Sequence, residues 1–337
     1  MSEKIKIYTS ANDIDIKTWS DLVQSSTVAS WFQTTEAYRF FDSLSFLEAF
    51  CVAVESCGVL KGVVVGFIQR DGGRLKQYLS RRAIINGGPL LSEDIEDDEL
   101  TFLLTAVKDL LKRKAIFIET RNFNDYSRWR SVFEKYGFKY EQHYDIQVDT
   151  TAIDVVNSNI GKSRKRDVRV SLRDGASIVE KPTNKQIKDY YLILSELYMN
   201  KVKTPLFPFE FFERLFQLSD SLFLLVEYNE EIVGGTVCVG LKGKALYEMY
   251  ACGQDGVYKN IFPSELATFS GIQQAVDKGY PVFDMMGAGK PDDGGYGVRD
   301  FKLKFGGKLV EFGRYDYICN RFLYNIGKLG VTILKKL

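Results

Sequence analysis

Residues 52–67 read VAVESCGVLKGVVVGF, and residues 224–240 read LLVEYNEEIVGGTVCVG. Each stretch holds two runs rich in valine and other apolar residues on either side of a short polar turn, a pattern typical of a β-hairpin. Gly62 in the first stretch aligns with Gly234 in the second. Two matching hairpins in one chain predict a duplicated domain.

The segments that follow each hairpin recur in the same order. After the first hairpin the sequence predicts a helix, a buried strand, a second helix and a final strand, at residues 97–113, 115–119, 127–135 and 140–149. After the second hairpin it predicts the same series at residues 264–277, 282–285, 298–304 and 309–317. A chain of 337 residues usually forms two domains, because single cores stop growing at roughly 250–300 residues. We therefore expect domains over residues 1–152 and 153–337.

This order of elements predicts the architecture of each half. Hairpin strands pair antiparallel, whereas a strand–helix–strand unit gives parallel pairing. The predicted fold class is therefore α/β with mixed sheets. The same layout is that of the GNAT fold, so we expect two tandem GNAT-like (acyl-CoA N-acyltransferase-like) domains.

Composition argues against several kinds of chemistry. The net charge of +1 gives no argument for nucleic acid binding. His143 is the single histidine, so we expect neither a histidine-based triad nor a metal site. The five cysteines form no C-x-x-C pair and are expected to be reduced thiols. The first residues carry no apolar leader and no run of 18 apolar residues occurs, which predicts a cytoplasmic protein.

The most unusual segment is FDMMGAGKPDDGGYGVRDFKLKFGG, residues 283–307. Seven of its 25 residues are glycine, and it follows an apolar strand. Glycine permits tight turns and close approach of the backbone to a ligand, and α/β folds place ligands where a strand leads through such a loop into a helix. Arg299, Lys302 and Tyr296 add charge and an aromatic ring. A binding loop is the sharper interpretation, and a structural loop with surface cations is the alternative.

A second candidate segment is the basic run KSRKRDVRVSLR, residues 162–173. Helical spacing places four cations on one face, namely Lys162, Arg166, Arg169 and Arg173. Several guanidinium groups on one face suit phosphate, through forked charge-assisted hydrogen bonds. A solvated helix face is the alternative.

A third candidate is the pair Tyr247 and Tyr250, on the strand before the second half's long helix. Their hydroxyl groups could position an acceptor, or the rings could simply be core and edge aromatics. The junction after that strand, Cys252–Tyr258, reads CGQDGVY. It lacks the Q/R-x-x-G-x-G/A loop whose backbone N–H groups hold the pyrophosphate of coenzyme A. We therefore expect no coenzyme A and no other cofactor.

Taken together, these features resemble the FemABX family. The most specific parts are Trp31-Phe32-Gln33-Thr34, the basic run 162–173, and Phe301-Lys302 followed by Phe305-Gly306-Gly307. Members of this family are non-ribosomal peptidyltransferases built like two fused GNAT domains. The resemblance implies an aminoacyltransferase with aminoacyl-tRNA as donor and a peptidoglycan precursor or another amine as acceptor. No long heptad segment occurs, so we expect no coiled-coil arm.

The resemblance also implies roles for matched residues. Phe301 and Lys302 would lie at the transfer site, where Lys302 would stabilise the carbonyl oxyanion or hold the tRNA 3′ end. A basic residue that opens the second domain would contact the precursor diphosphate. Its candidates are Arg164, Lys165 and Arg166. A first-domain lysine serves the same purpose in the family, but this chain departs from that motif, and its nearest cation is Arg39.

Several questions stay open at the level of sequence. Asp284 and Asp300 are candidate general bases, and the donor's own phosphate is an alternative. A GNAT-type acyltransferase with another donor, acting on a polysaccharide or lipid-linked amine, is a second function, and a non-catalytic phosphoglycan- or RNA-binding module is a third. The basic, weakly amphipathic tail 321–337 predicts peripheral membrane contact or, alternatively, a helix docked on its own domain.

Overall fold

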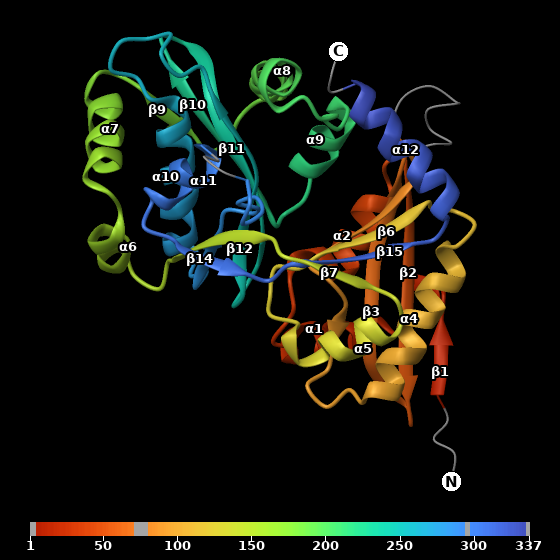
Figure 1. Cartoon of the computed structure of the whole chain (residues 1–337). Coiled ribbons are helices and arrows are strands. Elements are labelled where there is room, and N and C mark those ends of the chain that lie inside the picture. Colours follow the sequence, from red (N-terminus) through yellow and green to blue (C-terminus); the bar gives the residue numbers. More distant parts are fainter. Residues whose placement is uncertain (1–4, 71–79, 294–296, 335–337) are drawn as a thin grey trace. The chain divides into compact units, whose positions relative to one another are not determined.

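The computed structural model describes residues 5–70, 80–293 and 297–334. The chain forms two compact units (Figure 1). The first unit comprises residues 1–143 and 311–337, and the second unit comprises residues 144–310. Each unit is built around one mixed sheet. The prediction of an α/β protein with two GNAT-like sheets and no coiled-coil arm is confirmed.

The sheet of the first unit contains one parallel pair among antiparallel ones. β4 and β6 run parallel, as the strand–helix–strand interpretation requires. Its strand order is β1 (Ile5–Tyr8), β2 (Leu47–Ser56), β3 (Val59–Gln69), β4 (Arg82–Asn86), β6 (Phe117–Arg121), β15 (Arg314–Ile318) and β7 (Lys139–Glu141), with β5 (Leu90–Leu91) beside β3. Its helices are α1 (Ile16–Ser25), α2 (Thr35–Asp42), α4 (Asp97–Leu111), α5 (Arg130–Lys135) and α12 (Arg321–Leu334), with short 3₁₀ turns η1 (Ala11–Asp13), η2 (Trp31–Gln33) and η3 (Ser127–Trp129).

The second unit repeats this plan around a parallel pair of β12 and β13. Its strand order is β14 (Lys308–Glu311), β8 (Tyr144–Asp149), β13 (Val282–Asp284), β12 (Ala245–Gly253), β11 (Glu231–Leu241), β10 (Ser221–Tyr228) and β9 (Ser177–Val179). Its helices are α6 (Ile153–Asn159), α7 (Lys162–Arg173), α8 (Asn184–Leu197), the π-helix η4 (Tyr198–Val202), α9 (Phe209–Phe216), α10 (Pro263–Asp277) and α11 (Gly297–Leu303).

The two hairpins share an irregularity at the same place. In the first, Val54 pairs with Gly62 and Glu55 with Leu60, which leaves Lys61 as an extra residue. In the second, Val226 pairs with Gly234 and Glu227 with Ile232, which leaves an extra residue directly before Gly234. A β-bulge is a specific feature of a fold, and its recurrence beside both matched glycines supports the duplication.

The final strand predicted for each half is broken, so the expectation of unbroken strands over 140–149 and 309–317 is wrong. The first breaks at residues 142–143 and the second at residues 312–313. Gly313 has φ of +65°, and a side chain there would meet the Tyr140 ring at 2.3 Å. After each break the chain enters the other sheet, so β8 lies between β13 and β14, and β15 lies between β6 and β7. The blue β15 among orange strands in Figure 1 marks this exchange.

The exchange changes where the units begin and end. Sequence indicated consecutive domains over 1–152 and 153–337, whereas the compact units divide after His143 and again before Glu311. The physical reason is strand pairing. β8 bonds to β13 in the second unit, and β15 bonds to β6 in the first.

The segment Trp31-Phe32-Gln33 is structural in this chain. All three side chains are buried. The Gln33 amide donates 2.9 Å hydrogen bonds to the carbonyl oxygens of Gly87 and Gly88, and its oxygen accepts from the Ser30 backbone. Gln33 therefore holds the glycine turn that follows β4.

The C-terminal tail forms a helix as far as it is described. Tyr324 of α12 packs edge-on against Phe117 of β6, with ring centroids 5.6 Å apart. Phe322 is 73% exposed. Peripheral membrane contact by this segment stays a prediction. In the described ranges, no helix is both long and apolar enough to cross a membrane.

A buried carboxylate links the exchanged strand β15 to β6. Glu119 Oε1 accepts a hydrogen bond from Arg121 and one of 3.1 Å from Arg314 on β15. Burial alone would raise the pKa of Glu119, but the guanidinium groups of Arg121, Arg314 and Arg82 lower that pKa from 4.5 to about 2. The ion pairs therefore stabilise the first unit at neutral pH.

We expect Glu119→Gln to destabilise the protein by about 3 kcal/mol at pH 7, the equivalent of the lowered pKa. A carboxylate with a depressed pKa contributes stability above its unfolded pKa, and that contribution is lost as pH falls toward 2. The difference in unfolding free energy between the variant and the parent should therefore become smaller as pH falls from 4.5 to 2. Urea unfolding at pH 7 and pH 3 measures it, with the exposed Glu134→Gln as control. An unchanged difference at both pH values would contradict the ion-pair account.

Candidate active site

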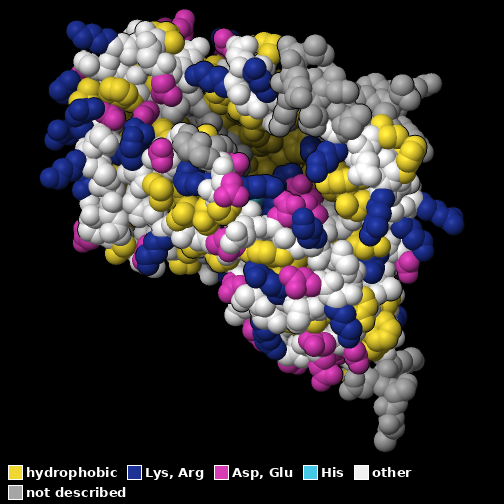
Figure 2. Space-filling view, viewed as in Figure 1, with side chains coloured by type: hydrophobic (Ala, Val, Ile, Leu, Met, Phe, Trp, Pro, Cys, Tyr) yellow, Lys and Arg dark blue, Asp and Glu magenta, His cyan; other side chains and the backbone are white. Residues whose placement is uncertain are grey.

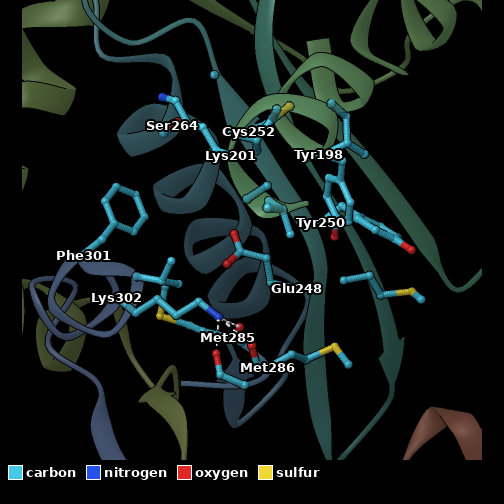
Figure 3. A pocket seen from close by; sticks show the side chains of 18 of the residues that line it. Tyr198, Lys201, Glu248, Tyr250, Cys252, Ser264, Met285, Met286, Phe301 and Lys302 are labelled. Atoms are coloured by element: carbon cyan, nitrogen blue, oxygen red, sulfur yellow. Dashed lines mark hydrogen bonds between the residues drawn. The ribbon is translucent and has the colours of Figure 1, made fainter. Parts of the chain in front are cut away.

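A hollow of about 470 Å³ opens in the second unit (Figure 3). Its walls come from η4, β12, α11 and the segment Met285–Gly287. This volume lies within the range of small-molecule sites. A π-helix such as η4 is rare and often occurs at functional sites. The hollow is therefore our candidate active site.

Lys302 projects from α11 to the floor of the hollow. Its Nζ donates hydrogen bonds to three consecutive backbone carbonyls: that of Met285, that of Met286 at 2.5 Å, and that of Gly287 at 2.9 Å (Figure 3). Met286 and Gly287 have φ of +47° and +65°, a left-handed conformation that is uncommon outside glycine. An ammonium group has three N–H donors, so these carbonyls use all of them.

Three buried carboxyl groups surround that ammonium. Burial lowers the pKa of Lys302 below its usual value, although Glu248, Asp145 and Asp284 act to raise it. Burial and the neighbouring Asp284 raise the pKa of Asp145 well above its usual value, and burial also raises the pKa of Asp284. Two carboxyl groups this close are coupled, because ionisation of one disfavours ionisation of the other. Lys302, Glu248, Asp145 and Asp284 therefore form one buried group of interacting side chains.

Asp284, which sequence suggested as a general base, has a structural task. Its side chain is fully buried. It accepts hydrogen bonds from the Gln147 amide at 3.0 Å and from the Met286 backbone at 2.9 Å. Asp284 thereby fixes the turn whose carbonyls hold Lys302. Asp300, the other suggested base, is exposed and does not line the hollow.

Sequence reasoning missed Glu248. It drew attention to Tyr247–Tyr250 for their hydroxyl groups, but Tyr247 is buried and does not line the hollow, whereas Tyr250 and Glu248 do. In β12, Tyr250 pairs with Val237 and Glu248 with Cys238, so Met249 is an extra residue. Such bulges re-aim side chains next to active sites. Glu248 Oε1 accepts a 3.1 Å hydrogen bond from the buried Thr236 hydroxyl, which fixes the carboxyl in place.

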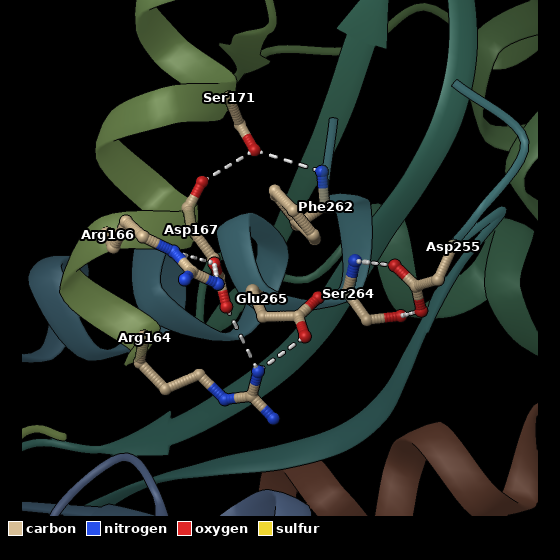
Figure 4. Close-up of polar contacts among 8 residues, drawn as sticks. All are labelled: Arg164, Arg166, Asp167, Ser171, Asp255, Phe262, Ser264 and Glu265. Atoms are coloured by element: carbon tan, nitrogen blue, oxygen red, sulfur yellow. Dashed lines mark hydrogen bonds and ion pairs between the residues drawn. The ribbon is translucent and has the colours of Figure 1, made fainter. Parts of the chain in front are cut away.

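Arg164, a candidate for the precursor diphosphate, is a buried side chain with partners of its own. It is 7% exposed, and its Nη1 lies 2.5 Å from Glu265 Oε1 and 3.6 Å from Asp167 Oδ2 (Figure 4). Its guanidinium lies over the Phe301 ring, 4.6 Å from the centroid. Arg164 does not line the hollow. It supports α11 from behind Phe301.

The remaining cations of α7 face solvent. Lys162, Lys165, Arg166, Arg169 and Arg173 are exposed. Figure 2 shows Lys and Arg side chains gathered on the left of the view, where Figure 1 places α7. Lys165 donates to the Asn157 carbonyl, and Arg166 pairs with Asp167 at 2.7 Å. The basic helix is thus present, and its phosphate role stays a prediction.

Other predicted residues lie apart from the hollow. Arg299 donates to the carbonyl oxygens of Ala288 at 2.8 Å and Lys290 at 2.5 Å, so it braces the glycine-rich loop. Tyr296 lies outside the described residues. Arg39 belongs to the first unit, where it lines a separate hollow of about 540 Å³. Of the predicted site residues, the hollow brings together Phe301, Lys302 and Tyr250.

The junction between β12 and α10 is closed by an internal anion. Asp255 Oδ1 accepts from the Ser264 backbone at 3.1 Å, and Oδ2 accepts from the Ser264 hydroxyl at 2.5 Å (Figure 4). The N-terminus of a helix attracts anions, and here Asp255 satisfies it. No cluster of three metal-ligating side chains occurs among the residues that the structure describes.

Residues 225–330 match the sequence model of the FemAB family. This stretch resembles the FemAB family. It contains β12, β13, α11 and thus Glu248, Phe301 and Lys302. The match confirms the resemblance over most of the residues that line the hollow, whereas η4 lies outside the matched stretch. It supports an enzyme of the acyltransferase type. No curated protein matches the chain in sequence.

Solved structures share the fold at low identity. The crystal structure of FemX matches with a TM-score of 0.71 at 15% identity, over 93% of this chain and 98% of that one. The C-terminal domain of a putative lysylphosphatidylglycerol synthetase from Agrobacterium fabrum matches with a TM-score of 0.58 at 16% identity, over 96% and 97%. A tandem GNAT protein from the clavulanic acid biosynthesis pathway matches with a TM-score of 0.60 at 10% identity, over 94% and 99%.

Proposed function

We propose that this protein is an aminoacyltransferase. It transfers an amino acid from aminoacyl-tRNA to an amine of a cell-wall or lipid-linked precursor. The observation that carries the proposal is the hollow with Phe301 and Lys302 at its floor, inside the stretch that matches the FemAB family. The similarity to FemX and to a putative lysylphosphatidylglycerol synthetase domain fits an acceptor of that kind.

The proposed chemistry is attack of the acceptor amine on the ester carbonyl of the aminoacyl group. Negative charge then develops on the carbonyl oxygen, and fixed positive charge nearby lowers the barrier. Lys302 supplies that charge. Because its three N–H groups bind the carbonyls of residues 285–287, it acts first as a positive charge at the floor and holds the turn around the reacting ester.

The choice of donor rests on Asp255. Coenzyme A would place its pyrophosphate at the N-terminus of the helix after β12, where Asp255 already binds Ser264. A second anion at that position would be repelled by the carboxylate. This observation supports aminoacyl-tRNA over an acyl-CoA donor.

We expect saturable binding of charged bulk tRNA and no binding of acetyl-CoA. Isothermal titration calorimetry with charged tRNA, the same tRNA after deacylation, and acetyl-CoA measures the three affinities. Charged tRNA should bind more tightly than deacylated tRNA, because the hollow accepts the aminoacyl group. Tight binding of acetyl-CoA would contradict the proposal, and equal affinity for both tRNA samples would favour a non-catalytic RNA-binding module.

A further inference from the structure

Glu248 lies in the hollow without a task in the chemistry above. We infer that the Glu248 carboxylate binds the ammonium group of the acceptor and takes its proton, as the general base of the transfer. This inference rests on the proposed function, because it assigns the proton acceptor of that same reaction.

The position of Glu248 fits a base. Its side chain is 5% exposed and still lines the hollow. Figure 3 shows its carboxyl pointing into the hollow, on the same side as the end of Lys302. Its Oε1 accepts a hydrogen bond from Thr236, and the Thr268 hydroxyl also interacts with the carboxyl, so two hydroxyl groups hold Glu248 at the wall of the hollow. Asp145 and Asp284, the other two carboxyls that interact with Lys302, do not line the hollow, whereas Glu248 does.

The charges around Glu248 favour a cation beside it. Burial raises the pKa of Glu248, whereas Lys302 of α11, whose ammonium is engaged by three carbonyls, acts to lower it. Cys238 of β11 and Tyr190 of α8 also lie close, and both are neutral because burial raises their pKa values. Asp255 and Lys201 are further charged residues at the wall of the hollow. Three carboxyl groups, those of Glu248, Asp145 and Asp284, thus interact with a single ammonium group at this end of the hollow.

The transfer reaction moves two protons and exchanges a C–O bond for a C–N bond. The bound ammonium gives one proton to Glu248 and becomes a neutral amine. The amine nitrogen forms a C–N bond with the ester carbonyl carbon, and the C–O bond to the ribose breaks. A second proton passes from that nitrogen to the departing ribose oxygen, so the products are an amide and a hydroxyl. Glu248 then returns its proton to solvent. Positioned bases of this kind contribute about 10²–10⁴-fold to rate.

The test compares Glu248→Gln with the parent, using charged tRNA as donor and butylamine or hydroxylamine as acceptor. Glutamine keeps the Thr236 contact but cannot take a proton. We expect kcat/KM for butylamine to fall about 10²–10⁴-fold at neutral pH. The loss should shrink at higher pH, as more butylamine is neutral in solution. Hydroxylamine is already neutral at pH 7 and needs no base to remove a proton before it attacks. Its kcat/KM should therefore be nearly the same in the variant as in the parent. Glu248→Asp should retain part of the activity.

A binding measurement separates this inference from the proposed function. Butylammonium should bind the parent by NMR titration, and Glu248→Gln should weaken that binding at least tenfold, with the exposed Glu196→Gln as a matched control. If the parent transfers no amino acid, the proposed function is wrong. The butylammonium titration still shows whether Glu248 binds an ammonium group. Equal butylammonium binding in parent and variant would overturn the inference. So would an equal loss for both acceptors at every pH, which would indicate a structural role.

Discussion

Lys302→Met is expected to lower transfer by about 10²–10³-fold, the usual effect of removing one group that stabilises an oxyanion. It should also destabilise the protein by about 3–5 kcal/mol, because Glu248 and the Asp145–Asp284 pair lose their cation. The carbonyls of Met285, Met286 and Gly287 lose their donor as well. Single-turnover transfer from charged tRNA and urea unfolding measure the two effects.

The control for this substitution is Lys304→Met, which removes an exposed lysine two residues away. It should change stability by less than about 0.5 kcal/mol and leave transfer intact. A Lys302→Met variant that is destabilised but transfers at the parental rate would show that Lys302 serves only the turn. That result would remove the oxyanion role from the proposed mechanism.

Arg164→Leu is expected to destabilise the protein by about 3–5 kcal/mol, because the half-buried Glu265 and the buried Asp167 lose the guanidinium that pairs with both. The double variant Arg164→Leu with Glu265→Leu should recover much of that stability. Replacing both members of an ion pair with apolar residues leaves no unpaired charge, whereas replacing one member does. Arg169→Ala, on the exposed side of the same helix, should have little effect. Urea unfolding of the three variants measures these differences.

The same series tests the role that family resemblance gave to Arg164. A residue that contacts a precursor diphosphate would change KM for the acceptor and leave stability nearly unchanged. A large loss of stability in Arg164→Leu with recovery in the double variant would instead support its place behind Phe301.

Sequence alone predicted much of the fold. The hairpins, the order of helices and the basic helix α7 are present because apolar periodicity and glycine turns specify them locally. The breaks before β8 and β15 were not predictable in the same way. Residues 142–143 contain neither glycine nor proline, and a lone glycine such as Gly313 fits a bulge as well as a break. Which sheet a strand enters depends on partners far away in the sequence.

The candidate site was predictable only in part. Resemblance identified Phe301 and Lys302, whose spacing is characteristic. Glu248 was missed because one carboxylate in an apolar strand has no local pattern, and the bulge at Met249 disturbs the alternation that would assign its face. The burial of Arg164 could have been predicted from the sequence of α7. The buried stripe of this helix follows helical spacing and consists of Arg164, Asp167, Val168 and Ser171. A helical wheel drawn for that stripe would have separated Arg164 from the exposed cations.

The exchange of strands has a consequence for biosynthesis. The neighbours of β15 in its sheet, β6 and β7, both precede residue 142, whereas β15 begins at Arg314. A ribosome that adds about 5–20 residues per second therefore releases β6 and β7 roughly ten to thirty seconds before the strand that joins them. During that interval residues 144–310 emerge and can fold before the sheet of the first unit is complete. Meanwhile β6 and β7 each keep an edge that has no partner strand. Nascent chains of this protein are thus exposed to premature edge-to-edge association until translation ends.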